Sequence, residues 1–358
     1  METQTLMSLT AVGLFFILIF DFFYKHFTFW QRQGLPSHRF ITTGWAKKPF
    51  FEFAEDTARR FAPHKIYGAY GPFNKILIVN DAKIVRELST KAMHKFPIRN
   101  SQLDQGTTNI RKSLFFMQAN EDWKRIRSIV TPAFTSGKLK RMMSPIERIA
   151  ENFIEHLHQE ADTGKTFDLK KYINGFAMDV IACCGYGVEI DSVRDPNHPV
   201  VVNATKILNV DVTITQIICF LFPKVAKWFK LDIFDKDAVN YFDKLTFEIV
   251  EKRLKEADGK QKSDLLGLMI EESGENKFGN LADNPHTKAL KGISPDELSG
   301  QGILFFIAGY DTSNATFDHC IFYLTQYPEW QEKLYQELNA VKDELDYDKL
   351  KHLKILNA

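Results

Sequence analysis

The stretch from Ser294 to Gln326 constrains the fold of this chain most, because it can form one unusually long helix. Ser294 is a favourable N-cap, Pro295 suits the first turn, and Glu297 completes a capping box. Only glycines interrupt the helical pattern, so we expect about 30 helical residues, roughly 45 Å at 1.5 Å per residue. Its centre, residues 303–308, is apolar on every side, which predicts a helix that runs through the interior of the protein.

Small and polar residues form one stripe on this helix, since Ala308, Asp311, Thr312 and Ala315 recur at i, i+3, i+4 and i+7. One interpretation is structural: the Thr312 hydroxyl bonds to the carbonyl of Ala308, and Asp311 finds a buried partner. The other is functional: small residues admit a flat ligand, and a hydroxyl and a carboxyl deliver protons to it. Gly309 favours the functional interpretation, because glycine inside a helix costs about 1 kcal/mol relative to alanine.

Length and composition predict a folded protein with a large core, because the 358 residues are 44% hydrophobic and 25% charged. The net charge of +1 gives no reason to expect a nucleic-acid partner. Four cysteines, two of them the adjacent Cys183 and Cys184, do not make a disulfide framework, so we expect a reducing compartment. No Cys-x-x-Cys or His-x-x-x-His spacing indicates zinc, and we assign no residue as a metal ligand.

The N-terminal segment from Leu6 to Tyr24 predicts a membrane-spanning helix, because its 19 residues would cover about 29 Å and are almost uniformly apolar. No lysine or arginine precedes it and several follow it, which predicts that the body of the protein lies on the cytosolic side. A cleaved signal peptide fits less well, since the segment lacks a basic start and a small-residue cleavage site. We therefore expect an anchor over residues 1–25, a linker over 26–50 and a folded domain over 51–358.

A second polar pair lies on a helix that we expect to begin at Asn120. Trp123 and Arg127 are i, i+4 neighbours, so an indole N–H and a guanidinium can point to the same ligand. Such donors suit a propionate or a phosphate. An aromatic–cation surface pair is the commoner explanation of this spacing when it stands alone.

Four further segments have readable patterns. Gly71–Pro72 predicts a hairpin, Asp81 predicts a helix N-cap, and Pro328 predicts the start of another helix. An apolar run over residues 210–222 is followed by lysines interleaved with aromatic residues: Lys224, Lys227, Trp228, Phe229 and Lys230. This pattern suits a membrane surface or, equally, a buried helix with a solvated end.

The sequence Ala308-Gly309-Tyr310-Asp311-Thr312-Ser313 resembles the oxygen-binding segment of the distal helix in cytochromes P-450, the haem-thiolate monooxygenases. Residues 131–140 resemble the region after helix C in microsomal members. Residues 176–192 resemble helix E and the turn beyond it, in the form of the animal family-3 or family-13-like clan. On these motifs the chain is identified as a member of the family over about residues 6–358.

The resemblance implies a mainly α fold with a small β region and one N-terminal transmembrane helix in the endoplasmic reticulum membrane. It implies haem as cofactor, an apolar small-molecule substrate, an NADPH-dependent reductase as electron donor, membrane lipid as a further partner, and insertion of one oxygen atom from dioxygen. Asp311 and Thr312 are the catalytic residues implied, as a proton relay. The cofactor-binding residues implied are Trp123 and Arg127, on a haem propionate, with Ala308 and Gly309.

The family's thiolate ligand, in a Phe-x-x-Gly-x-Arg-x-Cys-x-Gly loop, does not occur in these residues. Cys183 comes closest, but Asp179 and Ile181 replace the glycine and the arginine, and the segment reads as a helix. The family's Glu-x-x-Arg motif is also missing. We therefore expect a C-terminally truncated domain that is inactive over these 358 residues. The alternative hypothesis is a non-catalytic pseudoenzyme, a truncated gene product or a membrane-bound interaction protein.

Overall fold

The computed structural model describes residues 2–39, 48–71, 74–96, 108–208, 213–255, 264–273 and 292–357. It divides into two units, Met1–Pro97 and Ile98–Ala358, which are treated separately below. The first unit mixes helices with a small sheet and the second is helical, so the predicted fold class, mainly α with a small β region, is confirmed.

The first unit contains a three-stranded sheet in the order β1-β2-β3. Strand β1 runs parallel to β2, with Ser37 opposite Gly68, and β2 runs antiparallel to β3, with Tyr70 opposite Lys75. The last two strands form the predicted hairpin, although residues 72–73 of its turn lie outside the described residues. In chain order the elements are α1 (Glu2–Phe27), α2 (Phe29–Arg32), β1 (Ser37–Arg39), α3 (Phe50–Arg60), β2 (Ile66–Tyr70), β3 (Lys75–Val79), α4 (Ala82–Ser89) and the short 3-10 helix η3 (Met93–Lys95).

The predicted membrane-spanning helix is not supported: where side chains are described, no helix combines the length and the apolar character needed to cross a bilayer. Within α1 the described side chains begin at Gly13, so the first part of the predicted segment, Leu6 to Val12, lies outside them.

The last turn of α1 and the residues that follow it pack onto the sheet. Buried His26 bonds through Nε2 to the carbonyl of Gly71 at 3.1 Å. The Trp30 backbone N–H donates to the Tyr70 hydroxyl at 2.8 Å, and its indole N–H donates to the carbonyl of Ala69 at 3.1 Å. The first residues of the predicted linker, 26–50, therefore have fixed packing, whereas residues 40–47 lie outside the described part of the chain.

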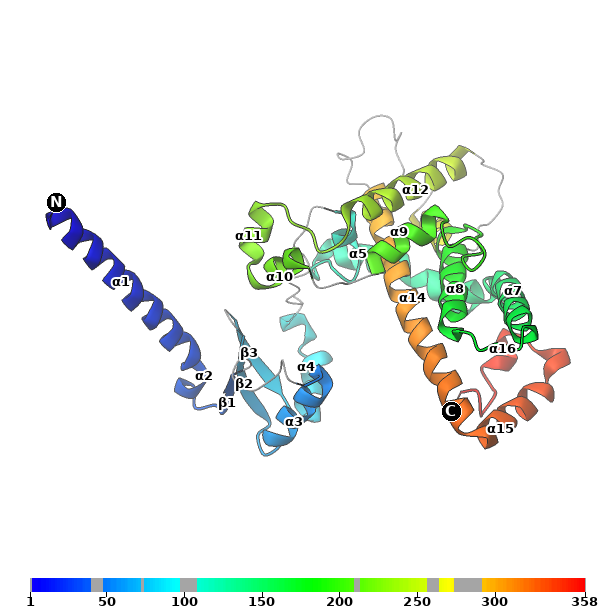
Figure 1. Ribbon diagram of the computed structural model, residues 1–358, viewed down its shortest axis with the longest axis horizontal. Coiled ribbons are helices and arrows are strands. Elements are labelled where there is room, and N and C mark those ends of the chain that lie inside the picture. The colour runs from blue at the N-terminus through cyan, green and yellow to red at the C-terminus, as the bar shows by residue number, and fades with distance from the viewer. Residues whose placement is uncertain are drawn as a thin grey trace. The chain divides into compact units, whose positions relative to one another are not determined.

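The second unit is built from helices around α14 (Figure 1). Helices α8 and α12 and the 3-10 helix η5 pack along α14, and their apolar side chains form the main core. The elements in chain order are η5 (Asn109–Lys112), α5 (Glu121–Val130), η6 (Thr131–Phe134), α6 (Ser136–Arg141), α7 (Met143–Asp162), α8 (Leu169–Ile181), the π-helical turn η7 (Ala182–Tyr186), α9 (Pro199–Leu208), α10 (Ile214–Leu221), α11 (Pro223–Trp228), α12 (Lys236–Lys255), α13 (Leu265–Ser273), α14 (Pro295–Gln326), α15 (Pro328–Asn339), η10 (Lys342–Glu344) and α16 (Tyr347–Leu350).

Helix α14 confirms the prediction of one long helix, with 32 residues between Ser294 and Tyr327. Both halves of the capping box form, because the Ser294 hydroxyl accepts from the Glu297 N–H and the Glu297 carboxylate accepts from the Ser294 N–H. The expected path through the interior holds for the first half, where Ile303 and Phe306 are buried. From Ala308 onward one side of the helix is exposed, so the prediction was wrong for that half.

The other predicted helix starts are also confirmed. The Asp81 carboxylate accepts from two backbone N–H groups at the start of α4, and the Asn120 side chain accepts from the Trp123 N–H at the start of α5. Pro328 is the first residue of α15. Cys183 lies in the π-helical turn after α8, which agrees with the sequence argument against a ligand loop there.

Candidate functional site

The predicted stripe on α14 exists as a solvent-facing strip. Ala308, Asp311, Thr312 and Ala315 are all exposed on the second half of the helix. The Thr312 hydroxyl donates to the carbonyl of Ala308 at 2.6 Å, as the structural interpretation requires. The buried partner expected for Asp311 by the same interpretation does not fit an exposed carboxylate. The strip therefore presents two small residues beside a carboxylate and a hydroxyl oxygen that can still accept a hydrogen bond.

Gly309 has a packing role on a different side of α14. A Cβ at this position would lie 2.8 Å from Cδ1 and 3.3 Å from Cγ1 of Ile181 on α8. The absence of a side chain thus lets the two helices approach closely. This contact accounts for the glycine without a ligand, and the predicted role of Gly309 in cofactor binding stays a prediction.

Trp123 and Arg127 are neighbours on α5, as predicted, but their donors do not meet. The Arg127 Cζ atom lies 5.1 Å from the centre of the Trp123 ring, so the pair forms a cation–π contact. The indole N–H donates to the carbonyl of Leu114 at 3.1 Å. The guanidinium is exposed, and within the described residues no carboxylate lies at ion-pair distance from it. Arg127 is therefore the open donor of the pair, and Trp123 supports it.

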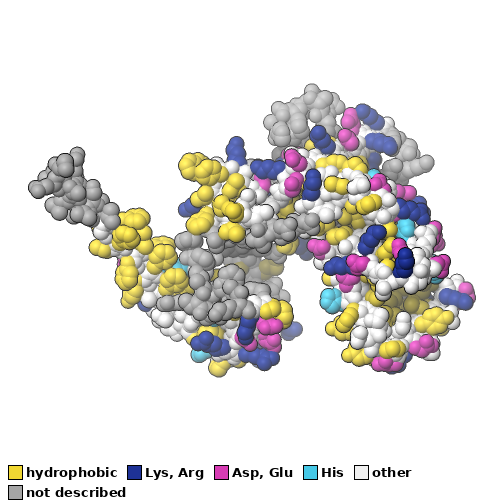
Figure 2. All heavy atoms as spheres, in the orientation of Figure 1, with side chains coloured by type: hydrophobic (Ala, Val, Ile, Leu, Met, Phe, Trp, Pro, Cys, Tyr) yellow, Lys and Arg dark blue, Asp and Glu magenta, His cyan; other side chains and the backbone are white. Residues whose placement is uncertain are grey.

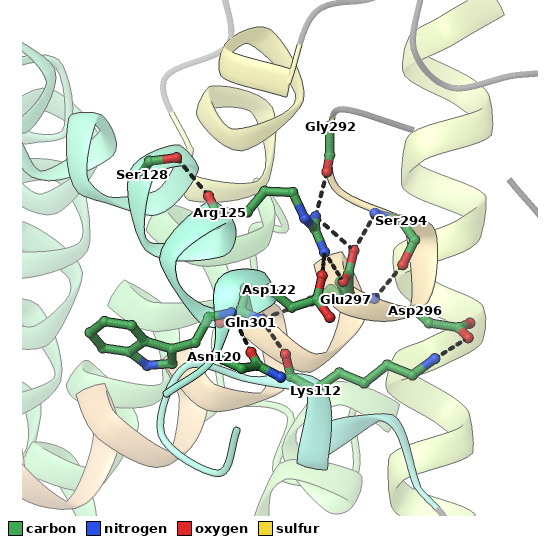
Figure 3. A network of polar contacts seen from close by, with 11 residues as sticks. Lys112, Asn120, Asp122, Arg125, Ser128, Gly292, Ser294, Asp296, Glu297 and Gln301 are labelled. Atoms are coloured by element: carbon green, nitrogen blue, oxygen red, sulfur yellow. Dashed lines mark hydrogen bonds and ion pairs between the residues drawn. The ribbon is translucent and has the colours of Figure 1, made fainter. Parts of the chain in front are cut away.

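An ion-pair network that no sequence pattern indicated connects α5 to the start of α14 (Figure 3). Arg125 Nη2 lies 2.5 Å from Glu297 Oε1, and Arg125 Nη1 donates to the carbonyl of Gly292, also at 2.5 Å. Asp122 lies 3.0 Å from the same guanidinium. The hydrogen bonds that Arg125 donates to the Glu297 carboxylate are the main reason that the pKa of Arg125 is raised. Glu297 thus caps α14 and fixes α5 at the same time.

Buried and partly buried polar groups fasten η5 to α14 and α12. Lys112 Nζ lies 2.5 Å from Asp296 Oδ2, and the Asn109 amide donates to Asp243 at 3.1 Å. The Ser299 hydroxyl donates to Asp243 at 2.5 Å. Burial raises the pKa of Asp243, and the hydrogen bonds from Ser299 and Asn109 oppose that rise. The segment before α5 is therefore held to the first half of α14 by side chains from three elements.

These features fit a flat, carboxylate-bearing group. Small residues on the α14 strip leave room for a ring, and an exposed guanidinium on α5 can take a carboxylate in a charge-assisted, bidentate hydrogen bond. The strip and Arg127 come from sites that the sequence singled out. The ion pair between Arg125 and Glu297 joins residues that are far apart in the chain.

The sequence of this chain is similar to those of known proteins. A family model described as "Cytochrome P450" matches residues 36–358. Cytochrome P450 3A2 of Rattus norvegicus is 27% identical over 348 residues, which are 95% of this chain and 66% of that protein. Cytochrome P450 3A29 of Sus scrofa is 31% identical over 82% of this chain and 57% of its own length. Cytochrome P450 3A5 of Homo sapiens is 31% identical over 77% of this chain and 54% of its own length. The chain thus spans between 54% and 66% of these three relatives.

Proposed function

Because the chain belongs to the cytochrome P450 family, we propose that it supplies the oxygen-side helix and a propionate-binding helix of a haem monooxygenase. The haem, when bound, supplies the dioxygen chemistry that inserts one oxygen atom into a substrate. The proposal includes an apolar small molecule as substrate and an NADPH-dependent reductase as electron donor.

The exposed strip on α14 is the observation that carries this proposal. The side chains of Ala308 and Ala315 are small and project little from the helix, so a planar ring can lie close to the backbone. The Asp311 carboxylate is in contact with solvent and can take up a proton from water and pass it on, and the Thr312 hydroxyl next to it can accept and pass on a proton at Oγ1. The bond from Thr312 to the Ala308 carbonyl fixes the direction of that hydroxyl. Gly309 lets α8 pack closely against a neighbouring side of the helix and so holds the strip in place.

Arg127 provides the second contact in the proposal. Its guanidinium is exposed and rests on the Trp123 ring, which limits the directions in which it can point. A haem propionate would receive two N–H donors from it in a bidentate bond. Such a charge-assisted bond is worth about 1.5–3 kcal/mol, or about 10- to 150-fold in affinity.

The first test is a haem titration of the full chain, followed by absorbance, with the variants Arg127→Leu and Lys124→Leu. Arg127→Leu is expected to weaken haem binding by about tenfold or more. Lys124 lies on the same helix but pairs with Glu121 at 2.8 Å, so Lys124→Leu serves as a matched control and should bind like the parent chain. Equal affinities in both variants would remove Arg127 from the site.

The second test addresses catalysis. In a form of the protein that also carries the family's cysteine thiolate loop, supplied with haem, reductase and NADPH, Asp311→Asn and Thr312→Val are each expected to lower product formation by about 10- to 100-fold at unchanged haem content. If that form without either substitution binds haem but never forms product, the result would favour the alternative, a non-catalytic membrane-bound interaction protein.

We also propose that the protein associates with a lipid membrane, with the endoplasmic reticulum as the location that the family suggests. Apart from Asp21, the described side chains of α1 from Leu14 to Tyr24 are apolar and largely exposed, with Phe20 at 72%. In the second unit, Cys219 and Ala226 bury one side of α10 and α11, while the other side exposes Trp228 at 80% beside basic residues. Figure 2 shows apolar side chains gathered on α1 and over α10 and α11. Exposed aromatic residues next to lysines suit the surface of an anionic bilayer.

A further inference from the structure

Gln301, a residue of α14 that the sequence did not single out, is fully buried and makes three hydrogen bonds to backbone groups through its side-chain amide. Its amide oxygen accepts from the Leu114 N–H at 2.9 Å. Its amide nitrogen donates to the carbonyl of Lys112 at 2.9 Å and to the carbonyl of Glu297 at 3.0 Å. A glutamine amide offers one carbonyl oxygen and two N–H donors, so both donors and the oxygen are engaged. Gln301 therefore holds both ends of the three-residue segment 112–114, and its contact with Lys112 can be followed in Figure 3.

The neighbouring glycine shows how tightly this segment lies on α14. A Cβ at Gly300 would stand 2.6 Å from the backbone oxygen of Asn109 and 3.2 Å from the backbone nitrogen of Ser113. Gln301 itself has an exposed fraction of 0%. In such a site an unsatisfied amide or peptide group would be costly, so the three bonds fix the position of the segment strongly.

Leu114 links Gln301 to Trp123 through two backbone hydrogen bonds. Its N–H is bonded to Gln301, and its carbonyl accepts the indole N–H of Trp123 at 3.1 Å. The Trp123 ring then supports the Arg127 guanidinium, whose Cζ lies 5.1 Å from the ring centre. A continuous chain of contacts thus runs from the buried core of α14 to the open guanidinium on α5.

Other contacts hold helix α5 in place but do not involve the indole ring of Trp123. Arg125 joins the helix to Glu297, and the Asn120 side chain caps its first turn. Neither bond touches the indole, which could rotate about its side-chain torsions while α5 stayed in place. The bond to Leu114 is what selects the ring orientation.

We propose that Gln301 is a positioning residue: through Leu114 it fixes the Trp123 indole, and through that ring it aims Arg127 at the carboxylate of the cofactor. This inference rests on the proposed function only in its last step, the binding of the carboxylate. The orientation of the ring is a property of the chain itself.

The test of that orientation is fluorine NMR of the full chain labelled with 5-fluorotryptophan, without haem. The five tryptophans give five resonances, and Trp123→Phe identifies the one that belongs to Trp123. Gln301→Met keeps the volume and removes the three bonds, and it should shift and broaden the Trp123 resonance alone. Ser299→Ala removes a buried hydrogen bond from the same turn of α14 without touching residues 112–114, and it should leave that resonance unchanged. An unmoved resonance in Gln301→Met overturns the proposal.

A second variant and a wild-type measurement cover the case in which Gln301→Met does not fold. Gln301→Asn keeps an amide but cannot reach residues 112 and 114 together, so it should give the same shift. In the wild-type chain the Leu114 amide should exchange with deuterium slowly, as a buried hydrogen-bonded group does. Fast exchange at Leu114 overturns the proposal without any variant.

The last step is tested by haem titration. Gln301→Met should weaken haem binding by about three- to tenfold, and should have no further effect in a Trp123→Phe background, because the contact that it supports is then already lost. Equal losses in both backgrounds would overturn the route through Trp123. If the fluorine signal moves but haem binds equally in every variant, Arg127 included, the proposed function fails while the positioning of the ring stands.

Discussion

Asp179 is a buried carboxyl group outside the candidate site, and it makes the stability of the second unit depend on pH. It lies on α8 with 7% exposure and accepts the Ser192 N–H at 3.0 Å. Burial raises the pKa of Asp179 from 3.8 to about 6; the Asp191 carboxylate adds to this rise, while the Ser192 hydrogen bonds and His156 oppose it. The folded state therefore holds this proton at pH values where the unfolded state has released it.

The expected effect of Asp179→Asn follows from that difference. Since the folded pKa lies above the unfolded one, the contribution of Asp179 is fully present below about pH 4 and is lost as the pH rises to about 6. Asparagine keeps the acceptor for Ser192 and never ionises. The free energy of unfolding of the variant, relative to the parent chain, should rise by about 1–3 kcal/mol between pH 4.5 and 7 and stay level above that. Urea unfolding across this range measures it. A flat difference for Asp179→Asn contradicts the prediction.

Gly300 allows a close approach of backbone to helix, and a single methyl group tests it. Gly300→Ala would place a Cβ 2.6 Å from the Asn109 oxygen, which belongs to backbone and cannot rotate away. We expect a loss of about 1–3 kcal/mol in the free energy of unfolding. Gly137→Ala is the matched control, because that helical position has open space around it and should gain about 0.5–1 kcal/mol. Urea unfolding that shows equal effects for the two variants would refute the close approach.

At the scale of elements, the junction of α5 with α14 organises the candidate site. One carboxylate, Glu297, closes the capping box of α14 and binds Arg125 of α5, so the start of one helix fixes the place of the other. Side chains on both sides are partly buried, with Glu297 exposed by 15%. Ion pairs of this kind contribute more than exposed ones, because removal of one partner leaves the other poorly solvated.

The variant Arg125→Met measures this junction. It removes the bonds to Glu297, Gly292 and Asp122 while retaining an unbranched apolar stem, and we expect a loss of about 1–3 kcal/mol. Lys124→Met, one residue earlier, breaks an exposed pair with Glu121 and should change stability by less than about 0.5 kcal/mol. Thermal or urea unfolding of both variants gives the comparison. Similar small losses would mean that packing alone holds α5 against α14.

At the scale of the whole molecule, apolar surface in both units raises the question of membrane contact. In the first unit it lies on the described part of α1, and in the second on α10 and α11. Exposed apolar side chains in these numbers are unusual for a surface in contact with water alone.

Fractionation tests this contact. The expressed chain should stay with membranes after washing with high salt or alkaline carbonate, because apolar burial does not depend on ion pairs. Deletion of residues 1–25 should weaken the attachment but not abolish it, and Trp228→Ser with Phe229→Ser in the deleted chain should release most of the rest. A matched Trp330→Ser variant in the deleted chain, at a partly exposed residue of α15, should stay bound to the same extent as the deleted chain itself. Release of the intact chain by salt alone would contradict membrane association through apolar side chains.

The starts of several helices, and which residues are neighbours within a helix, could be predicted from the sequence alone. The caps at Ser294, Asp81 and Asn120 and the pairing of Trp123 with Arg127 depend on residues at most four positions apart, where helical geometry alone fixes the distance. Family membership was readable for the same reason, since its motifs are short and local.

Tertiary packing determines which of these residues are exposed and which contacts fix their positions. Gln301 meets Leu114 across 187 residues and Arg125 meets Glu297 across 172, and no local pattern encodes such pairs. Packing also places Gly309 against Ile181, whereas Asp311 and Thr312 lie on the solvent-exposed side of α14. Contacts between distant segments arise from the burial of whole helix faces, so their partners are chosen by the shape of the assembled core and not by spacing along the chain.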